Sequence, residues 1–261
     1  MKQSLLSVEN ISRHYRLPRR RLLDRQPVLT AVDGASFQLQ RGETLGVVGE
    51  SGSGKSTLAK MVMAFERPDQ GRVLFDGSDI NELSAAALKQ IRRHFQMVFQ
   101  DPFGSLDPRR KVGWSIAEPL RAMATDDLSQ INDRISATLQ QVGLQARDAD
   151  KYPHEFSGGQ RQRIAIARAI ITHPALLVAD EAVSALDVSV QAQILNLLMD
   201  LKQELGLGIL FISHDLAVVA SICDRILVMR NGRIIETGPT AQVLTNPAHE
   251  YTGTLLVAAQ I

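Results

Sequence analysis

The residues of this 261-residue chain that are best suited to chemistry form one short glycine-rich stretch. Gly49, Gly52 and Gly54 are followed directly by Lys55 and Ser56. The spacing matches G-x-x-x-x-G-K-[ST], in which backbone N–H groups turn inward around phosphate oxygens, the lysine reaches the β/γ-phosphates and the hydroxyl binds Mg²⁺. The stretch therefore predicts a nucleoside triphosphate site, whose other members are Glu50, Ser51, Ser53 and Thr57.

A phosphate loop must lie between a strand and a helix, and the flanking residues provide both. Residues 44–48 are short and apolar, as expected for a buried parallel strand. Residues 56–64 are compatible with a helix, whose N-terminus would add a partial positive charge facing the phosphates. A glycine-rich turn with a purely structural purpose would not require this context, so we expect a phosphate site.

A pair of carboxylates follows a second apolar segment. Residues 175–179 predict a buried strand that ends in Asp180 and Glu181. In an open α/β sheet, such a strand delivers its acid to the edge where phosphates bind. Asp180 is then the predicted Mg²⁺ partner, and Glu181 the group that polarises the water attacking the γ-phosphate. Without a phosphate loop, the pair would indicate only a polar strand end.

The surrounding elements alternate between strands and helices. Strands are expected at 36–40, 44–48 and 72–75, and the basic insert 18–25 is expected to be a solvated surface loop between edge strands. From about residue 101 to 156 the pattern is helical, with Ser129 as the cap of a helix reaching about Val142.

The α/β alternation returns in the last third. Helices are expected at about 158–172 and 190–205, and strands at 175–179 and 209–213. A hairpin should join 225–230 to 233–236 through Asn231-Gly232. The whole pattern predicts an α/β fold with an inserted helical lobe.

Composition limits the possible function classes. The net charge of +1 gives no support to a nucleic-acid binder, which needs a basic face. The one cysteine, Cys223, allows no internal disulfide and is expected to be a buried thiol in a reducing compartment. No apolar run reaches the ~18 to 20 residues that span a bilayer. We therefore expect any membrane association to go through a partner.

The stretch Phe156-Ser-Gly-Gly-Gln160 resembles the signature of the ATPase subunits of ABC transporters, normally Leu-Ser-Gly-Gly-Gln. The resemblance implies that Ser157, Gly158, Gly159 and Gln160 open a helix whose N-terminus binds the γ-phosphate held by a second ATPase subunit. Two ATP molecules would thus lie between two such domains.

Other family landmarks follow in order. Gln100 matches the glutamine that senses Mg²⁺ and the attacking water, and the resemblance makes it a metal contact with Ser56 and Asp180. Asp187 ends a Ser-Ala-Leu-Asp stretch that matches the loop crossing the dimer interface. His214 matches the histidine that contacts the γ-phosphate, so Glu181, His214 and Gln100 form the implied catalytic set. Tyr15 stands where the family places an aromatic residue that stacks on adenine.

The resemblance covers roughly residues 5 to 245 and implies a domain organisation. It implies a single ABC ATPase domain with a P-loop NTPase (RecA-like) core, an antiparallel β subdomain and an inserted helical subdomain. The core and β subdomain would be about 1–100 and 158–245, the helical subdomain about 101–157, and a short tail 246–261.

Finer details resemble the ATPases of dipeptide, oligopeptide and nickel importers. These are the stretches 99–109, 152–154, 180–190 and 246–252, the last with Glu250 in place of a usual proline. The implied partners are a second ATPase subunit, usually a different chain and otherwise an identical one, and two transmembrane permease subunits that dock near Gln100 and residues 102–110. A substrate-binding protein would take part indirectly, and no nucleic acid is involved. The implied location is the cytoplasmic face of a bacterial inner membrane.

Two other function classes remain open at this point. One is the ATPase of another ABC transporter, such as an exporter of peptides or metals. The other is a soluble ABC ATPase of translation or DNA repair, which should show two ATPase domains or a long coiled-coil insert. This sequence shows neither feature. The transported molecule need not touch this subunit, so the sequence does not name it.

Overall fold

The computed structural model describes residues 4–19, 26–101, 104–123 and 130–259. The chain divides into two compact units, Met1–Leu83 with Leu210–Ile261, and Ser84–Ile209. The predicted helical lobe, residues 101–157, lies within the second unit. Among the described helices, none has both the length and the apolar character needed to cross a membrane.

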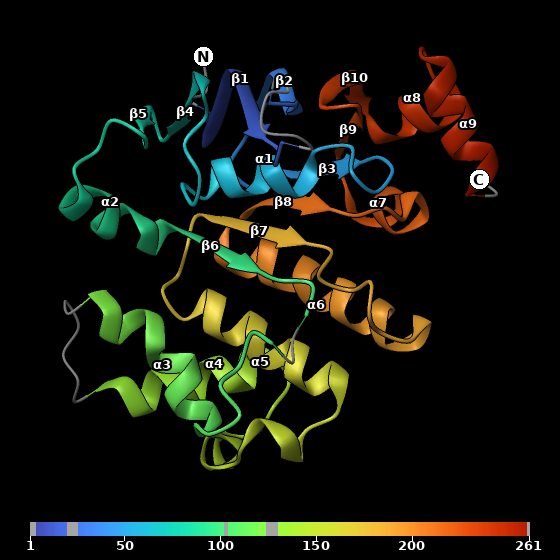
Figure 1. The fold of residues 1–261 in the computed structure, drawn as a ribbon. Helices are drawn as coiled ribbons and strands as arrows, with labels where there is room; N and C mark the ends of the chain where they lie inside the picture. The colour runs from blue at the N-terminus through green and yellow to red at the C-terminus, as the bar shows by residue number, and fades with distance from the viewer. Residues whose placement is uncertain (1–3, 20–25, 102–103, 124–129, 260–261) are drawn as a thin grey trace. The chain divides into compact units, whose positions relative to one another are not determined.

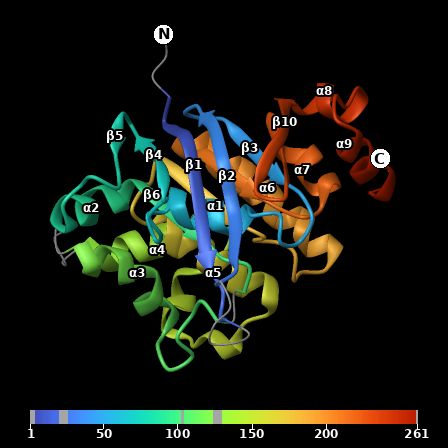
Figure 2. The same ribbon diagram turned by 45° about the horizontal axis from the view of Figure 1, so that its top comes forward.

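The first unit contains an antiparallel sheet of order β2-β1-β4-β5. Its strands are β1 (Leu6–Arg16), β2 (Val28–Leu39), β4 (Gln70–Phe75) and β5 (Ser78–Asp79). Figure 2 shows β1 and β2 side by side. The expectation that the basic insert 18–25 joins two edge strands is wrong, because β1 lies between β2 and β4 and only β2 is at the edge. Residues 20–25 of that insert lie outside the described residues.

The first unit also contains the strand before the phosphate loop. This strand, β3 (Thr44–Val48), is buried along its length and lies between β9 (Arg225–Arg230) and β8 (Gly208–Ile212), with β10 (Arg233–Pro239) beyond β9. β3 pairs parallel to β9, and β9 pairs antiparallel to β10. The predicted hairpin turn is confirmed, since Asn231 and Gly232 both have positive φ, 49° and 81°. The unit's helices are α1 (Lys55–Val62), α7 (Leu216–Ile222), α8 (Thr240–Thr245) and α9 (Glu250–Ala258).

The second unit pairs two parallel strands, β6 (Phe95–Val98) and β7 (Leu176–Asp180), with a group of helices. The helices are α2 (Ala85–Ile91), α3 (Val112–Met123), α4 (Ile131–Gln141), α5 (Gly158–Ile170) and α6 (Val188–Leu205). Helices α3, α4 and α5 lie together (Figure 1). The described residues between 104 and 156 contain helical segments and no strand, as predicted.

Helix boundaries follow the predicted signals with small shifts. Helix α6 ends at Leu205, and its C-cap Gly206 has a φ of 66°, the left-handed conformation that glycine adopts at little cost. Helix α4 begins at Ile131 with Gln130 at its cap, and the predicted cap Ser129 lies outside the described residues. The single cysteine, Cys223, is buried as expected.

Candidate functional site

The predicted phosphate loop connects the buried strand β3 to the N-terminus of α1. Lys55 is only 5% exposed. Its Nζ donates to the carbonyl oxygens of Gly49 (2.7 Å) and Glu50 (2.8 Å), and Ser53 N–H closes the turn on the Glu50 carbonyl (3.1 Å). The lysine therefore lies inside the loop, while Ser56 is exposed at the first turn of α1.

The loop rests on two neighbouring strands through backbone contacts. Gly232, in the hairpin turn after β9, donates its N–H to the Ser53 carbonyl (2.9 Å). Gly54 has a φ of 106°, and a Cβ atom there would overlap the carbonyl oxygen of Ala31 on β2. Only glycine combines this φ with so close an approach of two backbones. The loop's shape is thus set by main-chain groups of the first unit.

His214 lies beside the phosphate loop. It follows β8, and Ser213 donates its N–H to the carbonyl of Val47 on β3 (3.1 Å), which aligns the ends of the two strands. A pocket of about 440 Å³ is lined by His214 and Gly49 together. Asp215 then caps α7 by accepting from the N–H groups of Ala217 and Val218. The structure therefore brings the predicted histidine next to the start of the loop.

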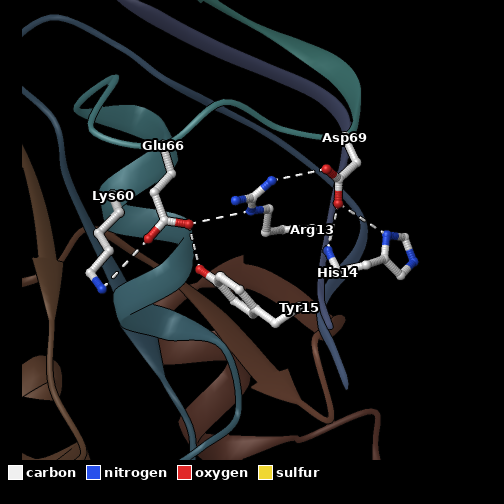
Figure 3. Close-up of polar contacts among 6 residues, drawn as sticks. All are labelled: Arg13, His14, Tyr15, Lys60, Glu66 and Asp69. Carbon is white, nitrogen blue, oxygen red and sulfur yellow. Dashed lines mark hydrogen bonds and ion pairs between the residues drawn. The ribbon is translucent and has the colours of Figure 1, made fainter. Parts of the chain in front are cut away.

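Tyr15 is half-buried near the end of β1, and Figure 3 shows its surroundings. It pairs with Leu29 on β2, two residues before Ala31, whose carbonyl faces Gly54. Its hydroxyl donates to Glu66 Oε2 (2.5 Å), and the guanidinium of Arg13 lies 5.1 Å from its ring centroid. The ring is therefore held in place by Arg13 and by Glu66, which follows the C-terminal end of α1.

A network of charges surrounds Tyr15. Glu66 also accepts from Arg13 Nε (3.3 Å) and lies 3.7 Å from Lys60 Nζ, in the last turn of α1. Asp69 accepts from Arg13 Nη1 (2.9 Å) and from the backbone N–H of His14 (2.6 Å). The hydrogen bond from Tyr15 lowers the pKa of Glu66, and the backbone N–H of His14 lowers the pKa of Asp69. Both carboxyls are thus stabilised as carboxylates.

The predicted acidic pair lies in the second unit, where β7 ends. Asp180 is the last residue of β7, and Glu181 follows with a positive φ of 49°. Such a conformation is uncommon for a residue other than glycine, asparagine or aspartate, and it tends to occur at functional sites. The Glu181 carbonyl accepts from both the N–H (3.1 Å) and the Oγ (3.0 Å) of Ser184. The backbone therefore turns sharply after Asp180, at the end of β7.

The predicted signature opens α5, also in the second unit. Ser157 caps the helix, its Oγ accepting from Gln160 N–H (3.4 Å) while its own N–H donates to Gln160 Oε1 (3.0 Å). This reciprocal pair is a capping box. Ser157 and Gln160 are exposed, Gly158 and Gly159 are half-buried, and Phe156 is buried. The helix N-terminus is therefore open to solvent, as an anion-binding terminus requires.

The remaining predicted residues also belong to the second unit. Asp187 is the N-cap residue of α6, makes no capping hydrogen bond with its side chain, and is exposed. Gln191 Nε2 stabilises the preceding turn by donating to the carbonyls of Val183 (3.0 Å) and Leu186 (3.1 Å). Gln100 is exposed just after β6. Residues 102 and 103 of the predicted docking stretch lie outside the described residues. The arrangement of these residues around one nucleotide stays a prediction.

The donor types suit Mg²⁺ more than a protein-enclosed metal. In the described parts of the chain, no group of three or more His, Cys, Asp or Glu side chains could hold a metal ion. Magnesium keeps several waters and binds one or two protein oxygens together with substrate phosphates. Ser56, in the first unit, offers a hydroxyl, and Asp180, in the second unit, offers a carboxylate, and each is a donor type that magnesium accepts.

Sequence reasoning missed several residues that support this site. Glu66 and Arg13 contact Tyr15, and Asp69 in turn binds Arg13. Tyr251 reaches the phosphate loop through its hydroxyl. The alternation of Arg13 and Tyr15 along β1, two residues apart, placed them on one face and could have suggested the first contact. No local pattern pointed to Glu66, and Tyr251 stood out only as part of the stretch 246–252, with no role in the site attached to it.

Comparison with known proteins identifies the family of this chain. Residues 32–184 match the family model described as "ABC transporter". The chain is 50% identical over its whole length to the "Probable peptide ABC transporter ATP-binding protein y4tS" of Sinorhizobium fredii, of which it covers 74%. It is 47% identical to the dipeptide transport ATP-binding protein DppF of Escherichia coli, over 99% of this chain and 77% of the relative.

Other similarities extend the comparison. The glutathione import ATP-binding protein GsiA of Salmonella typhimurium is 52% identical over 88% of this chain, and the match spans 37% of that relative's length. Among solved structures, cbiO1 of Clostridium perfringens, part of the transporter complex cbiONQ, has a TM-score of 0.80 at 30% identity, covering 94% of this chain and 92% of that one. A dimer of the ATP-binding cassette MJ0796 with ADP and Pi has a TM-score of 0.78 at 27% identity, covering 90% and 98%.

Proposed function

This chain belongs to the ABC transporter family as an ATP-binding, ATP-hydrolysing subunit, and we propose that it powers the uptake of peptides. The observation that carries the cargo class is the 50% identity across the whole chain to a peptide transporter's ATP-binding protein. The relatives that transport dipeptides and glutathione, itself a short peptide, support the same class over a nickel importer or an exporter.

The proposed reaction transfers the γ-phosphoryl group of ATP to water. Lys55 and the N–H groups of its loop would bind the β- and γ-phosphates, and Ser56, Asp180 and Gln100 would hold Mg²⁺, which neutralises the developing charge when bound. Glu181 would accept a hydrogen bond from the attacking water, and His214 beside Gly49 would contact the γ-phosphate. Most of the catalysis would come from positioning and charge stabilisation.

The proposed assembly has two ATPase subunits. The open N-terminus of α5, with Ser157 and Gln160 exposed, supports a role in binding the γ-phosphate of a second subunit's nucleotide. Two permease subunits would dock near Gln100, and a substrate-binding protein would deliver the peptide. The proposed location is the cytoplasmic face of a bacterial inner membrane. We further propose that the chain forms a single ABC ATPase domain, in which residues from about 101 to 157 are the helical subdomain.

Replacing Glu181 tests the chemistry. Glu181→Gln keeps the size of the side chain and removes the carboxylate, so ATP turnover should fall about 10²- to 10³-fold while ATP binding is retained. Glu204→Gln, which alters a carboxyl on α6 that accepts from Gln141, is the matched control and should hydrolyse ATP normally. Wild-type turnover in Glu181→Gln would contradict the role of Glu181.

Uptake in cells tests the cargo. A strain that lacks this chain should lose uptake of a radiolabelled dipeptide, and the wild-type chain should restore it where Glu181→Gln does not. Dipeptide uptake that is unchanged in the deletion strain would overturn the cargo proposal and leave the ATPase chemistry intact.

A further inference from the structure

The segment from Asn246 to Thr252 plays no part in the proposed reaction, yet the half-buried carboxylate of Glu236 anchors it. The carboxylate of Glu236, on β10, accepts from the N–H groups of Ala248 (2.7 Å) and His249 (3.1 Å) and from Thr252 Oγ1 (2.5 Å). Burial alone would raise the pKa of Glu236, but these donors outweigh it and lower the pKa. The ionised carboxylate therefore fixes the N-terminus of α9 against β10.

Tyr251 stands in the first turn of α9 and is only 5% exposed. The guanidinium of Arg230, at the end of β9, lies 4.5 Å from its ring centroid. Its hydroxyl oxygen accepts from the backbone N–H of Glu50 (3.3 Å). Burial raises the pKa of Tyr251, so the hydroxyl stays protonated at neutral pH. The side chain thus ends on the phosphate loop itself.

The Glu50 residue is held from both sides by this arrangement. Its carbonyl accepts from Lys55 Nζ (2.8 Å) and from Ser53 N–H (3.1 Å), which lie within the loop. Its N–H donates outside the loop, to the hydroxyl oxygen of Tyr251. The pocket beside Gly49 and His214 is completed by Leu255 and Ala258 of α9, so the helix runs alongside the loop.

We propose that Tyr251 is a positioning residue for nucleotide binding: through its hydroxyl it holds the Glu50 peptide, and so the loop that Lys55 organises, in the phosphate-binding shape. Glu236 acts one step further away, by holding the helix that carries Tyr251. A role limited to packing would need only the ring of Tyr251 against Arg230. The hydroxyl therefore separates positioning from packing.

The experiment removes that hydroxyl and nothing else. Tyr251→Phe keeps the ring, and Thr254→Ala is the matched control, because Thr254 Oγ1 donates to the Glu250 carbonyl (3.2 Å) on the exposed side of the same helix. Amide hydrogen exchange of the peptide covering residues 49–53, without nucleotide, reports the loop directly. Titration with a fluorescent ATP analogue gives the Kd, and thermal unfolding gives the Tm.

In Tyr251→Phe, exchange of the loop peptide and the Kd for the analogue should both rise about 2- to 10-fold, as for the loss of one hydrogen bond. The Tm should fall by no more than about 5 °C. Glu236→Gln should raise loop exchange in the same direction, with a larger loss of Tm. The exchange measurement does not depend on what the protein transports.

The proposal is overturned if Tyr251→Phe matches Thr254→Ala in both loop exchange and Kd. It is also overturned if exchange rises equally across the whole chain as the Tm falls, which would indicate packing alone. Wild-type loop exchange in a Glu236→Gln variant with a lowered Tm would remove Glu236 from the proposal.

Discussion

The two ends of the proposed nucleotide site, both in the first unit, are built from different materials. The phosphate end consists of backbone groups and one buried lysine: Lys55 is 5% exposed, and the loop closes on itself and on Gly232 through N–H···O=C bonds. The base end, around Tyr15, consists of charged side chains near the surface, where Arg13 and Asp69 are 26% and 38% exposed. Backbone geometry resists solvent, salt and most substitutions, whereas exposed ion pairs contribute only about 0.2 to 1 kcal/mol each. We therefore expect changes at the phosphate end to abolish function and changes at the base end to modulate it.

The largest expected effect comes from Lys55→Ala. The change removes the cation for the phosphates and also the donor that ties the carbonyls of Gly49 and Glu50, so ATP turnover should fall at least about 10²- to 10³-fold. Lys60→Ala, at the other end of α1, removes only an exposed contact to Glu66 and should leave turnover within a few-fold. Steady-state ATPase assays compare the two. Similar losses would break the contrast between the ends.

The next effect separates backbone contact from backbone conformation. Gly54→Ala would force a Cβ into the Ala31 carbonyl at a φ of 106°, and nucleotide binding should be lost. At Gly52 the φ is 80°, but no atom lies where a Cβ would stand. Gly52→Ala should therefore lower the free energy of unfolding by only about 1 to 2 kcal/mol. Nucleotide titration and thermal unfolding of both variants check this. Equal effects would mean that the contact with β2 does not matter.

A smaller effect is expected at the base end. Tyr15→Ala removes the proposed stacking partner of adenine and should raise the KM for ATP about 5- to 100-fold, with kcat changed much less, in line with ~1 to 3 kcal/mol for a base stacked on an aromatic ring. Tyr15→Phe keeps the ring and loses only the bond to Glu66, so its KM should lie between those of the wild type and Tyr15→Ala. An unchanged KM in Tyr15→Ala would argue against stacking at this position.

The smallest effect concerns Glu66 and pH. Its pKa is lowered in the folded protein, chiefly by the Tyr15 hydrogen bond, so it contributes stability above the ordinary glutamate pKa of about 4.3. That contribution is lost as the pH falls through the lower folded pKa. Glu66→Gln should be slightly less stable than the wild type at pH 7, and the difference should shrink at acid pH. Thermal unfolding between pH 7 and 3 measures this, and a difference that grows on acidification would contradict the sign.

The parts of the fold that were predictable depend on local rules. The phosphate loop, the capped signature helix and the Asn231-Gly232 hairpin are each defined within a few neighbouring residues, because glycine conformations, caps and turns are local properties. Element boundaries differ from the predictions: α5 ends at Ile170 rather than near Thr172, and β2 begins at Val28, well before the predicted residue 36. Helix ends and strand lengths depend on tertiary packing as well as local preference.

The amino-acid sequence by itself determined the chemistry of the phosphate loop, the nature of the acidic pair and the membership of an ATPase family. Those features depend on residue type at fixed short spacing. Only the tertiary structure decided which side chains hold Tyr15 and the phosphate loop in place. The Tyr15–Glu66 bond joins residues 51 positions apart, and the Glu50–Tyr251 bond joins residues 201 apart. Such contacts leave no short-range pattern, because they depend on how the strands and helices of the unit pack together.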